Sequence, residues 1–173
     1  QALDGLAQAG YIYKIQGKGS FVSPKKADMQ LNHLIGFSDE MRSLGLAPSN
    51  LLVDQQLVFP NETVAQQLKL DPKQKVYYIV RVRCADGVPM AVERLHMPFY
   101  RFAGIENQNL SGSVYALLRE NYGCESCRAV QSIQAGAATG QEAKLLEIKP
   151  GAPVLRICRT TYECDGTAFE YVE

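Results

Sequence analysis

The chain has 173 residues, and its 18 lysines and arginines balance 18 aspartates and glutamates, so its formal net charge is zero. A net charge of zero argues against a protein that is held to nucleic acid by bulk charge. With 46% apolar and 21% charged residues, the composition is that of a globular chain and excludes collagen-like and disordered classes. No apolar stretch approaches the roughly 20 residues of a membrane span, so we expect no membrane partner.

The net charge of zero is the sum of two unlike parts. Residues 1–27 hold four lysines against one aspartate, a net charge of +3, whereas residues 28–173 hold 14 bases against 17 acids, a net charge of −3. The chain is therefore a basic N-terminal segment joined to a mildly acidic body.

The basic segment has the pattern of a helix followed by a hairpin. Apolar residues at helical spacing stop near Gly10, where a helix would end. Two β-prone runs, residues 11–15 and 20–22, flank the turn-forming stretch Gln16–Gly19. A helix followed by a basic, glycine-rich hairpin is the order of a winged helix.

The body alternates strand-like and helix-like runs with turn residues between them. Strand patterns cover Leu51–Phe59, Val76–Cys84, Pro89–Met97, Arg128–Ala135, Val154–Cys164 and a last run from Thr167. Helix patterns cover Ser38–Leu44, Asn61–Leu70, Ser113–Tyr122 and a segment from the capping box Thr139/Glu142 to Glu147. Tight turns between strands, such as Asp86-Gly87, make neighbouring strands antiparallel, so we predict an α+β domain.

Arg81 and Arg83 are the most informative pair of charges in the body. Because Arg81 and Arg83 are two residues apart on one strand, their side chains leave the same face. The residues between and before them at even positions, Val76, Tyr78, Val80 and Val82, take the other face. Adjacent guanidinium groups repel unless an anion or carboxylate lies between them, and their planar forks match a phosphate. The alternative is a solvated strand face with scattered acids.

Two serines strengthen the interpretation as an anion site. Ser38 and Ser113 each stand at the start of a predicted helix, where unpaired N–H groups and the helix dipole favour negative charge. Serine is also an ordinary N-cap, so each serine alone has a structural explanation. The interpretation depends on their convergence with the arginines.

The register of the hairpin decides whether Glu93 belongs to this site. A two-residue turn pairs Arg81 with Val92 and puts Glu93 on the opposite face, whereas a three-residue loop, 85–87, pairs Arg81 with Ala91 and puts Glu93 on the arginine face. On that face, Glu93 could accept hydrogen bonds from a hydroxyl or amide beside a bound phosphate.

The five cysteines, an odd number scattered through the chain, argue for a reducing compartment, the cytoplasm. Cys124 and Cys127 have the C-x-x-C spacing of a metal or redox site. No second pair follows at zinc-site distance, and His33 and His96 are distant in sequence. We therefore expect neither a metal nor another cofactor.

Several stretches of the chain resemble one known family. ALDGLAQAGYIYKIQGKGSFV (residues 2–22) resembles the end of the recognition helix and the wing of a GntR-type winged helix-turn-helix repressor. Four stretches resemble the UTRA effector-binding domain of the HutC-like branch of that family: GFSDEMRSLGLAPS (36–49), YIVRVRCADGVPMAVERLHMP (78–98), SGSVYALLRENYG (111–123) and PGAPVLRICRTTYECDGTAFEYV (150–172). The resemblance implies a truncated DNA-binding domain in residues 1–23, a linker in 24–30 and a UTRA domain in 31–173.

The resemblance also implies a function. UTRA domains share the chorismate-lyase-like fold, form dimers and control operator binding when a small metabolite binds. The chain is most similar to repressors of N-acetylglucosamine use, which recognise amino-sugar phosphates. Carried over by motif, the phosphate ligands would be Arg81, Arg83, Ser38, Ser113 and Tyr115, and the sugar ligands would be Glu93 and Glu170.

The predicted wing can contact DNA. Gly17 and Gly19 permit close approach of the backbone, and Lys18 could enter a minor groove. An ordinary glycine turn with an exposed lysine is the alternative. The first two DNA-binding helices of the family are expected outside this chain, so the operator sequence is not encoded here.

Two other functions compete with that of a ligand-sensing regulator. One is a lyase-like enzyme of the same fold that acts on a small anionic substrate, with Glu93 or Glu170 as general acid or base. The sequence shows no nucleophile paired with a base, which argues against it. The other is a dimerisation module whose pocket is empty.

Overall fold

The computed structural model describes residues 3, 5, 6, 12–22 and 36–173. The chain forms two compact units, residues 1–32 and 33–173. The predicted linker 24–30, Gly10 and His33 lie outside the described residues.

The N-terminal unit contains the expected hairpin. Strands β1 (Ile12–Ile15) and β2 (Gly19–Val22) pair antiparallel, with Ile15 opposite Gly19. The turn between them closes through a hydrogen bond from the Lys18 amide to the Ile15 carbonyl at 3.0 Å. Gly17 has a φ of 79°, a left-handed conformation that favours glycine, and Lys18 beside it is exposed.

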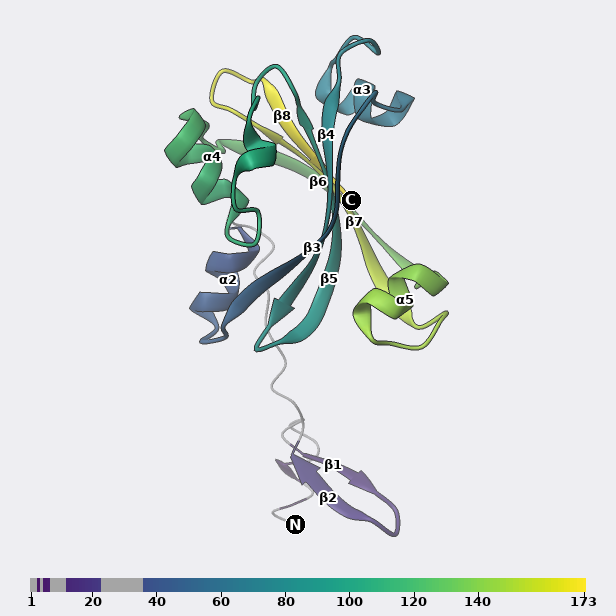
Figure 1. Ribbon diagram of the computed structural model, residues 1–173. Helices are drawn as coiled ribbons and strands as arrows, with labels where there is room; N and C mark the ends of the chain where they lie inside the picture. The colour runs from purple at the N-terminus through teal and green to yellow at the C-terminus, as the bar shows by residue number, and fades with distance from the viewer. Residues whose placement is uncertain (1–2, 4, 7–11, 23–35) are drawn as a thin grey trace. The chain divides into compact units, whose positions relative to one another are not determined.

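The second unit is built on one six-stranded, fully antiparallel sheet (Figure 1). Its strands, in chain order, are β3 (Pro48–Val58), β4 (Val76–Ala85), β5 (Val88–Pro98), β6 (Arg128–Ala137), β7 (Pro153–Tyr162) and β8 (Ala168–Val172). The order across the sheet is β3-β4-β5-β8-β7-β6. The last strand of the chain therefore lies between β5 and β7, which brings Glu170 to the middle of the sheet.

Helices cover both faces of this sheet. They are α2 (Phe37–Ser43), α3 (Glu62–Leu68), the 3-10 turn η1 (Ile105–Asn107), α4 (Val114–Tyr122) and α5 (Gly140–Leu146). Figure 1 shows α2 and α4 on one side and α3 and α5 on the other. The predicted α+β class is confirmed. None of the described helices is long and apolar enough to cross a membrane.

The helix boundaries follow from the caps that the sequence predicts. Ser113 is the N-cap of α4, and Gly123, in a left-handed conformation, ends the helix. Thr139 and Glu142 form a complete capping box at the start of α5. The start of α2 differs from expectation: its N-cap is Gly36, so Ser38 lies inside the first turn.

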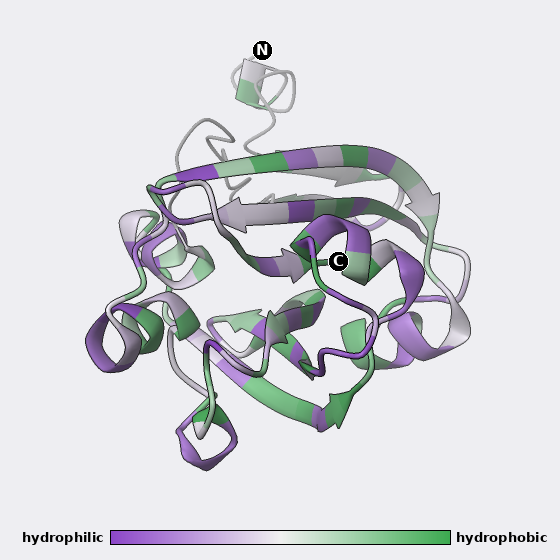
Figure 2. Cartoon of the chain, turned by 90° about the horizontal axis from the view of Figure 1, so that it is seen from above, coloured by the Kyte–Doolittle hydropathy of each residue, from purple (hydrophilic) through white to green (hydrophobic). Residues whose placement is uncertain are grey.

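Two apolar clusters hold the helices to the sheet. On the α4 side, Tyr77 and Ile79 of β4 pack with Phe102, Leu118 and Phe169. On the α3 side, the cluster joins Val64, Leu68, Val76, Ala168 and Tyr171. Tyr77 and Ile79 share the face of β4 that carries Arg81 and Arg83, so this face is apolar in the first half of the strand. The face that carries Val76 and Val82 is therefore not the sole apolar face of β4. Figure 2 shows hydrophobic and hydrophilic residues alternating along strands of the sheet.

Candidate functional site

A β-bulge sets which residue faces Arg81. The turn between β4 and β5 has two residues, Asp86 and Gly87, both with positive φ, so of the two alternatives the two-residue turn is present and the three-residue loop is not. Beyond Cys84 and Pro89 the register shifts, which leaves Met90 unpaired and places Arg81 directly opposite Glu93. Glu93 therefore lies on the arginine face, as the site requires, through a bulge and not through a longer loop.

Glu93 is the carboxylate that lies between the two arginines. Arg81 donates to Glu93 Oε2 from Nε at 2.8 Å and also from Nη2, and Arg83 Nη1 donates to Glu93 Oε1 at 2.5 Å. Arg81 is only 1% exposed, and Arg83 and Glu93 are each 7% exposed. The alternative of a solvated strand face was therefore wrong.

The charge state of Glu93 follows from these contacts. Burial acts to raise the pKa of Glu93, but Arg83 and Arg81 hold that pKa below its ordinary value. Glu93 is therefore an ionised hydrogen-bond acceptor, poorly suited to hold a proton as a general acid at neutral pH.

The other donors of the arginines fix the segment before α4. Arg81 Nη1 donates to the carbonyl oxygens of Leu110 and Gly112 at 3.2 and 3.3 Å. Asn50 of β3, which pairs with Arg83, accepts from Arg83 Nε at 3.1 Å and donates to the Gly112 carbonyl at 3.2 Å. These bonds place the adjacent Ser113, whose Oγ accepts from the Ala116 amide at 3.3 Å.

A second polar group forms where α4 meets β7 and β8. Tyr115 donates from its hydroxyl to Glu170 Oε2 at 2.5 Å, and Thr161 donates to the same oxygen at 2.8 Å. Arg159 Nη2 donates to the Tyr115 hydroxyl at 2.8 Å. Burial, reinforced by Glu170, raises the pKa of Tyr115, so its hydroxyl stays protonated as a donor.

A bulge in β8 is what turns Glu170 toward α4. Thr161 pairs with Glu170 and Tyr162 pairs with Ala168, so Phe169 is the extra residue. Phe169 packs in the cluster on the α4 side, and Glu170 bonds Tyr115 of α4. Consecutive residues thus point to one side of the sheet, which strict alternation would not allow.

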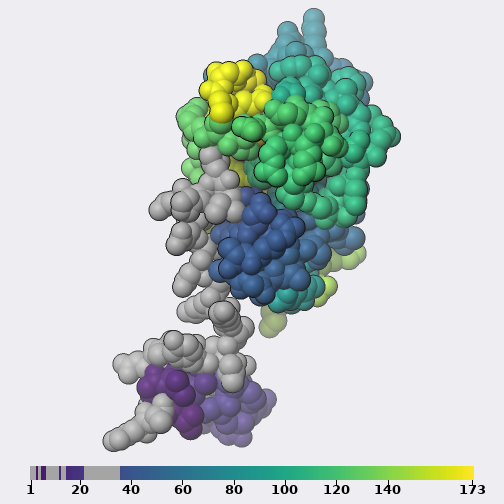
Figure 3. Space-filling model, turned by 90° about the vertical axis from the view of Figure 1, so that its left-hand side faces the viewer, coloured from purple at the N-terminus to yellow at the C-terminus, as the bar shows by residue number. Residues whose placement is uncertain are grey.

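Helix α2 joins the two groups. The ring of Phe37 lies 4.5 Å from the guanidinium carbon of Arg83. A Cβ at the neighbouring Gly36 would lie 2.9 Å from a ring carbon of Tyr115. Ser38 is 2% exposed. Figure 3 shows the α2 segment in blue directly below the green segment of α4, so that the two together cover this face.

The two groups make one largely buried polar layer between the sheet and helices α2 and α4, in which Asn50, Tyr115 and Arg159 are half-buried. Its members are Asn50, Arg81, Arg83, Glu93, Tyr115, Arg159, Thr161 and Glu170. The charges of Glu170 and Arg83 act on each other, as do those of Glu93 and Arg159. Among these members three arginines stand against two glutamates, so the layer has one positive charge in excess before the half-buried Glu40 of α2, whose charge also acts on Arg159, is counted.

The structure brings together most of the residues that the sequence predicts and adds three. Six of the seven predicted residues belong to this layer or border it: Arg81, Arg83, Glu93, Ser113, Tyr115 and Glu170. The seventh, Ser38, is buried in the first turn of α2, next to Phe37. Sequence reasoning missed Asn50, Thr161 and Arg159. Arg159 had a usable signal, because it interrupts a β-prone run in the same way as Arg81 does.

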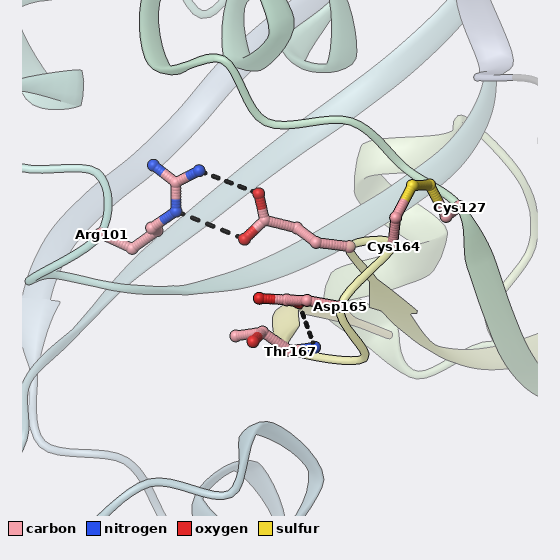
Figure 4. The surroundings of a disulfide bond; sticks show 6 residues. Arg101, Cys127, Cys164, Asp165 and Thr167 are labelled. Atoms are coloured by element: carbon pink, nitrogen blue, oxygen red, sulfur yellow. Dashed lines mark hydrogen bonds and ion pairs between the residues drawn. A yellow bond between two sulfur atoms is a disulfide. The ribbon is translucent and has the colours of Figure 1, made fainter.

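The cysteines do not follow the C-x-x-C pattern. Cys127 pairs in a disulfide with Cys164, with their Cα atoms 5.0 Å apart, and Cys124 is a free, buried thiol. Figure 4 shows this bridge beside the ion pair of Arg101 with Glu163. The expectation of uniformly reduced cysteines is thus corrected at one pair. Among the described residues, no cluster of three or more histidine, cysteine or acidic side chains could hold a metal ion.

Comparisons with known proteins agree with this architecture. Residues 43–173 match the UTRA domain family. The chain is 38% identical over 173 residues to the HTH-type transcriptional repressor NagR of Bacillus subtilis, which covers all of this chain and 71% of that protein. It is 26% identical over 171 residues to the mannosyl-D-glycerate transport/metabolism system repressor MngR of Escherichia coli, covering 99% of this chain and 71% of that protein.

A solved structure shows the same relationship. The crystal structure of PhnF from Mycobacterium smegmatis superposes with a TM-score of 0.86 at 26% identity, covering 99% of this chain and 76% of that chain. The effector domain of PhnF alone gives a TM-score of 0.75 at 27% identity, covering 79% of this chain and 85% of that chain. NagR and MngR are named as repressors, so these comparisons do not support the lyase-like alternative. The chain belongs to the GntR family of transcriptional regulators, in the HutC-like branch that carries a UTRA domain.

Proposed function

We propose that this regulator is a cytoplasmic homodimer that represses transcription from its operator until the UTRA domain binds a small phosphorylated metabolite, an amino-sugar phosphate. The observation that carries the proposal is the positive charge in excess in the buried polar layer, which favours an anionic ligand between the sheet and helices α2 and α4. Buried charge is unfavourable unless it is paired, so an anion that enters this layer gains more than one at the surface.

The contacts in the layer assign different roles to the two β4 arginines. Arg81 directs its donors to Glu93 and to the carbonyls of Leu110 and Gly112, so it positions the site. The hydrogen bonds of Arg83 to described residues use Nε and Nη1, which leaves Nη2 for a ligand. We assign the phosphate to Arg83 Nη2 together with the hydroxyls of Ser38 and Ser113, and to the Tyr115 hydroxyl, which then exchanges its hydrogen bond to Glu170 for one to the phosphate.

The two glutamates suit the sugar part of such a ligand. Glu93 and Glu170 both accept hydrogen bonds through their carboxyl oxygens, and sugar hydroxyls and amides are donors. Repression is then relieved if the metabolite binds the DNA-incompetent state of the dimer more tightly than the DNA-competent state. A typical difference in binding free energy between two such states is about 1–3 kcal/mol. Residues 17–19 at the tip of the β1–β2 hairpin would contact DNA, with Lys18 near the phosphates.

Thermal unfolding of the full-length protein tests the proposal. The ligands are N-acetylglucosamine 6-phosphate, glucosamine 6-phosphate, the two free sugars and urocanate. A phosphorylated sugar at a hundredfold its Kd should stabilise the protein by about 2.7 kcal/mol, and the free sugar should not. Arg83→Lys, which keeps the charge but loses the planar fork, should abolish the preference, and Arg42→Lys on the exposed face of α2 should keep it.

The possible results separate the alternatives. Stabilisation by free sugars in preference to their phosphates would overturn the assignment of a phosphate to Arg83. Stabilisation by none of the five compounds would favour the dimerisation module with an empty pocket. Release of operator DNA on addition of the stabilising compound would connect the site to regulation.

A further inference from the structure

Arg159 differs from the other two arginines of the layer in how its donors are used. Arg81 and Arg83 each donate to the carboxylate of Glu93. Arg159 donates from Nη2 to the uncharged hydroxyl of Tyr115, and its Nε is buried without a hydrogen-bond partner among the described residues. The described residues also form no ion pair with Arg159, so the positive charge in excess is located at this side chain.

An unpaired, buried N–H is uncommon in a folded protein and needs an explanation. Nearly all such groups are paired, because an unpaired one has lost its hydrogen bonds to water without gaining another, and the cost is larger when the group is charged. The acids around Arg159 do not pair with it: Glu93 holds two other arginines, and Glu170 accepts from Tyr115 and Thr161. Burial acts to lower the pKa of Arg159, but Tyr115, Glu170, Glu93 and Glu40 together keep that pKa above its ordinary value and so favour the charged form.

The orientation of Arg159 is fixed in advance. Its Nη2 bond to Tyr115 holds one end of the fork, and its guanidinium carbon lies 5.7 Å from the centroid of the Tyr115 ring. Tyr115 is itself held by Glu170 at 2.5 Å. A donor that is positioned before its acceptor arrives loses little conformational freedom on binding, which is the arrangement expected of a ligand-binding group.

We propose that Arg159 is an effector-contacting residue whose Nε–H donates to an oxyanion of the ligand, in addition to the contacts assigned to Arg83 and the serines. This inference rests on the proposed function, because it concerns the same site. It makes Arg159 of β7, together with Arg83, a determinant of selectivity for an anionic over a neutral ligand. Arg81 is then a positioning residue for Glu93.

One carboxylate of the chain can compete with such a ligand. Glu40 of α2 is half-buried, and burial raises its pKa while the charge of Arg159 acts in the opposite direction. The Glu40 carboxylate is therefore the anionic group of α2 that Arg159 attracts in the absence of ligand. Removing its charge should leave Arg159 more available to an external oxyanion.

Inorganic phosphate is the probe that tests the proposal in the full-length protein. Calorimetric titration should show binding weakened about tenfold or more by Arg159→Lys, which keeps the charge but removes the Nε–H donor. Arg156→Lys is the matched control on the same strand, because Arg156 pairs with Glu142 outside the layer, and it should stay within twofold of wild type. Glu40→Gln should bind phosphate several-fold more tightly.

A direct readout follows the Arg159 side chain in the wild-type protein. In wild-type protein labelled with 15N-arginine, the Nε–H resonance that disappears in Arg159→Lys should shift as phosphate is added. An unmoved resonance, or an unchanged phosphate affinity in a variant that melts like wild type, would overturn the inference.

If sugar phosphates still stabilise the protein in that case, the proposed function stands without Arg159 as a ligand contact. A shift of the Arg159 resonance without stabilisation by any sugar phosphate would instead support the anion contact and count against the amino-sugar phosphate as effector.

Discussion

Arg81 and Glu93 lie directly opposite each other on β4 and β5, and both are almost fully buried. Their ion pair depends on the unpaired Met90, because without that bulge the two-residue turn would place Val92 opposite Arg81. One extra residue in β5 therefore decides whether the carboxylate faces the arginines or the α3 side of the sheet.

Arg81→Ala should lower the free energy of unfolding by about 3–5 kcal/mol, because it breaks a buried ion pair and leaves the charge of Glu93 half compensated. Urea denaturation at neutral pH measures the loss. Arg42→Ala is the control, since it breaks an exposed pair with Asp39 at 2.8 Å and should cost less than about 1 kcal/mol. A loss below about 1 kcal/mol for Arg81→Ala would show that the buried pair does not stabilise the domain.

The sequence predicts the parts of the fold that local chemistry determines. The capping box at Thr139, the N-cap at Ser113 and the turn at Asp86-Gly87 are signalled by residue types within a few positions, and the structure contains all three. The bulges at Met90 and Phe169 are not signalled in this way, because they result from strand pairing over the whole sheet. The two-residue turn alone would put Glu93 on the opposite face, and the bulge at Met90 returns it to the arginine face.

The unpredicted site residues have the same physical origin. Arg159 and Thr161 become site residues only when β8 inserts beside β7 and the bulge turns Glu170 toward Tyr115. Asn50 matters only because it pairs with Arg83. Spacing along the chain predicts which residues share a strand face, but not which strands become neighbours.

Glu142→Gln should make the stability of the domain less sensitive to acid. Hydrogen bonds from Arg156 and Thr139 lower the pKa of Glu142 from 4.5 to about 2. Because the folded pKa lies below the unfolded one, this stabilisation is present above about pH 4.5 and is lost as the pH falls toward 2. Glutamine can still accept from the Thr139 amide in the capping box but cannot keep the ion pair.

Urea denaturation at about pH 6 and about pH 3.5, on either side of the unfolded pKa, measures this difference. Wild type should lose more stability between the two values than Glu142→Gln. Glu62→Gln, in the first turn of α3, should lose as much as wild type. Equal losses in wild type and Glu142→Gln would contradict the assignment.

Reduction of the Cys127–Cys164 bridge should destabilise the domain. The bridge closes a loop with a sequence separation of 37, for which the chain-entropy model gives about 3–4 kcal/mol. Thermal unfolding with and without dithiothreitol measures the effect in wild type, and Cys127→Ser should lose the dependence on reductant. Cys84→Ser, which removes a free cysteine, should keep it. A wild-type melting temperature that is indifferent to reductant would contradict this prediction.

Gly36→Ala should separate α2 from α4. The added Cβ would lie 2.9 Å from Tyr115 Cδ2, a carbon in the body of the ring that cannot yield by itself. The φ of Gly36 is −67°, so the backbone accepts alanine and the cost is steric, about 1–3 kcal/mol. Gly112→Ala, with nothing within 4 Å of the new Cβ, should change stability by less than about 0.5 kcal/mol. Urea denaturation compares the two, and equal effects would argue against close packing of Gly36 on Tyr115.

Lys18→Ala should weaken the binding of the full-length protein to duplex DNA at every sequence. Lys18 is exposed at the tip of a hairpin whose flanking glycines, Gly17 and Gly19, both have positive φ, so its ammonium group can reach a phosphate. Loss of one phosphate contact should reduce the slope of log K against log salt concentration by about 0.9. Fluorescence anisotropy over a range of salt concentrations measures that slope. Lys73→Ala, an exposed lysine of the UTRA domain, should leave it unchanged, because the mildly acidic body does not bind DNA by bulk charge. An unaltered slope for Lys18→Ala would mean that the hairpin tip is an ordinary glycine turn and not a DNA-binding wing.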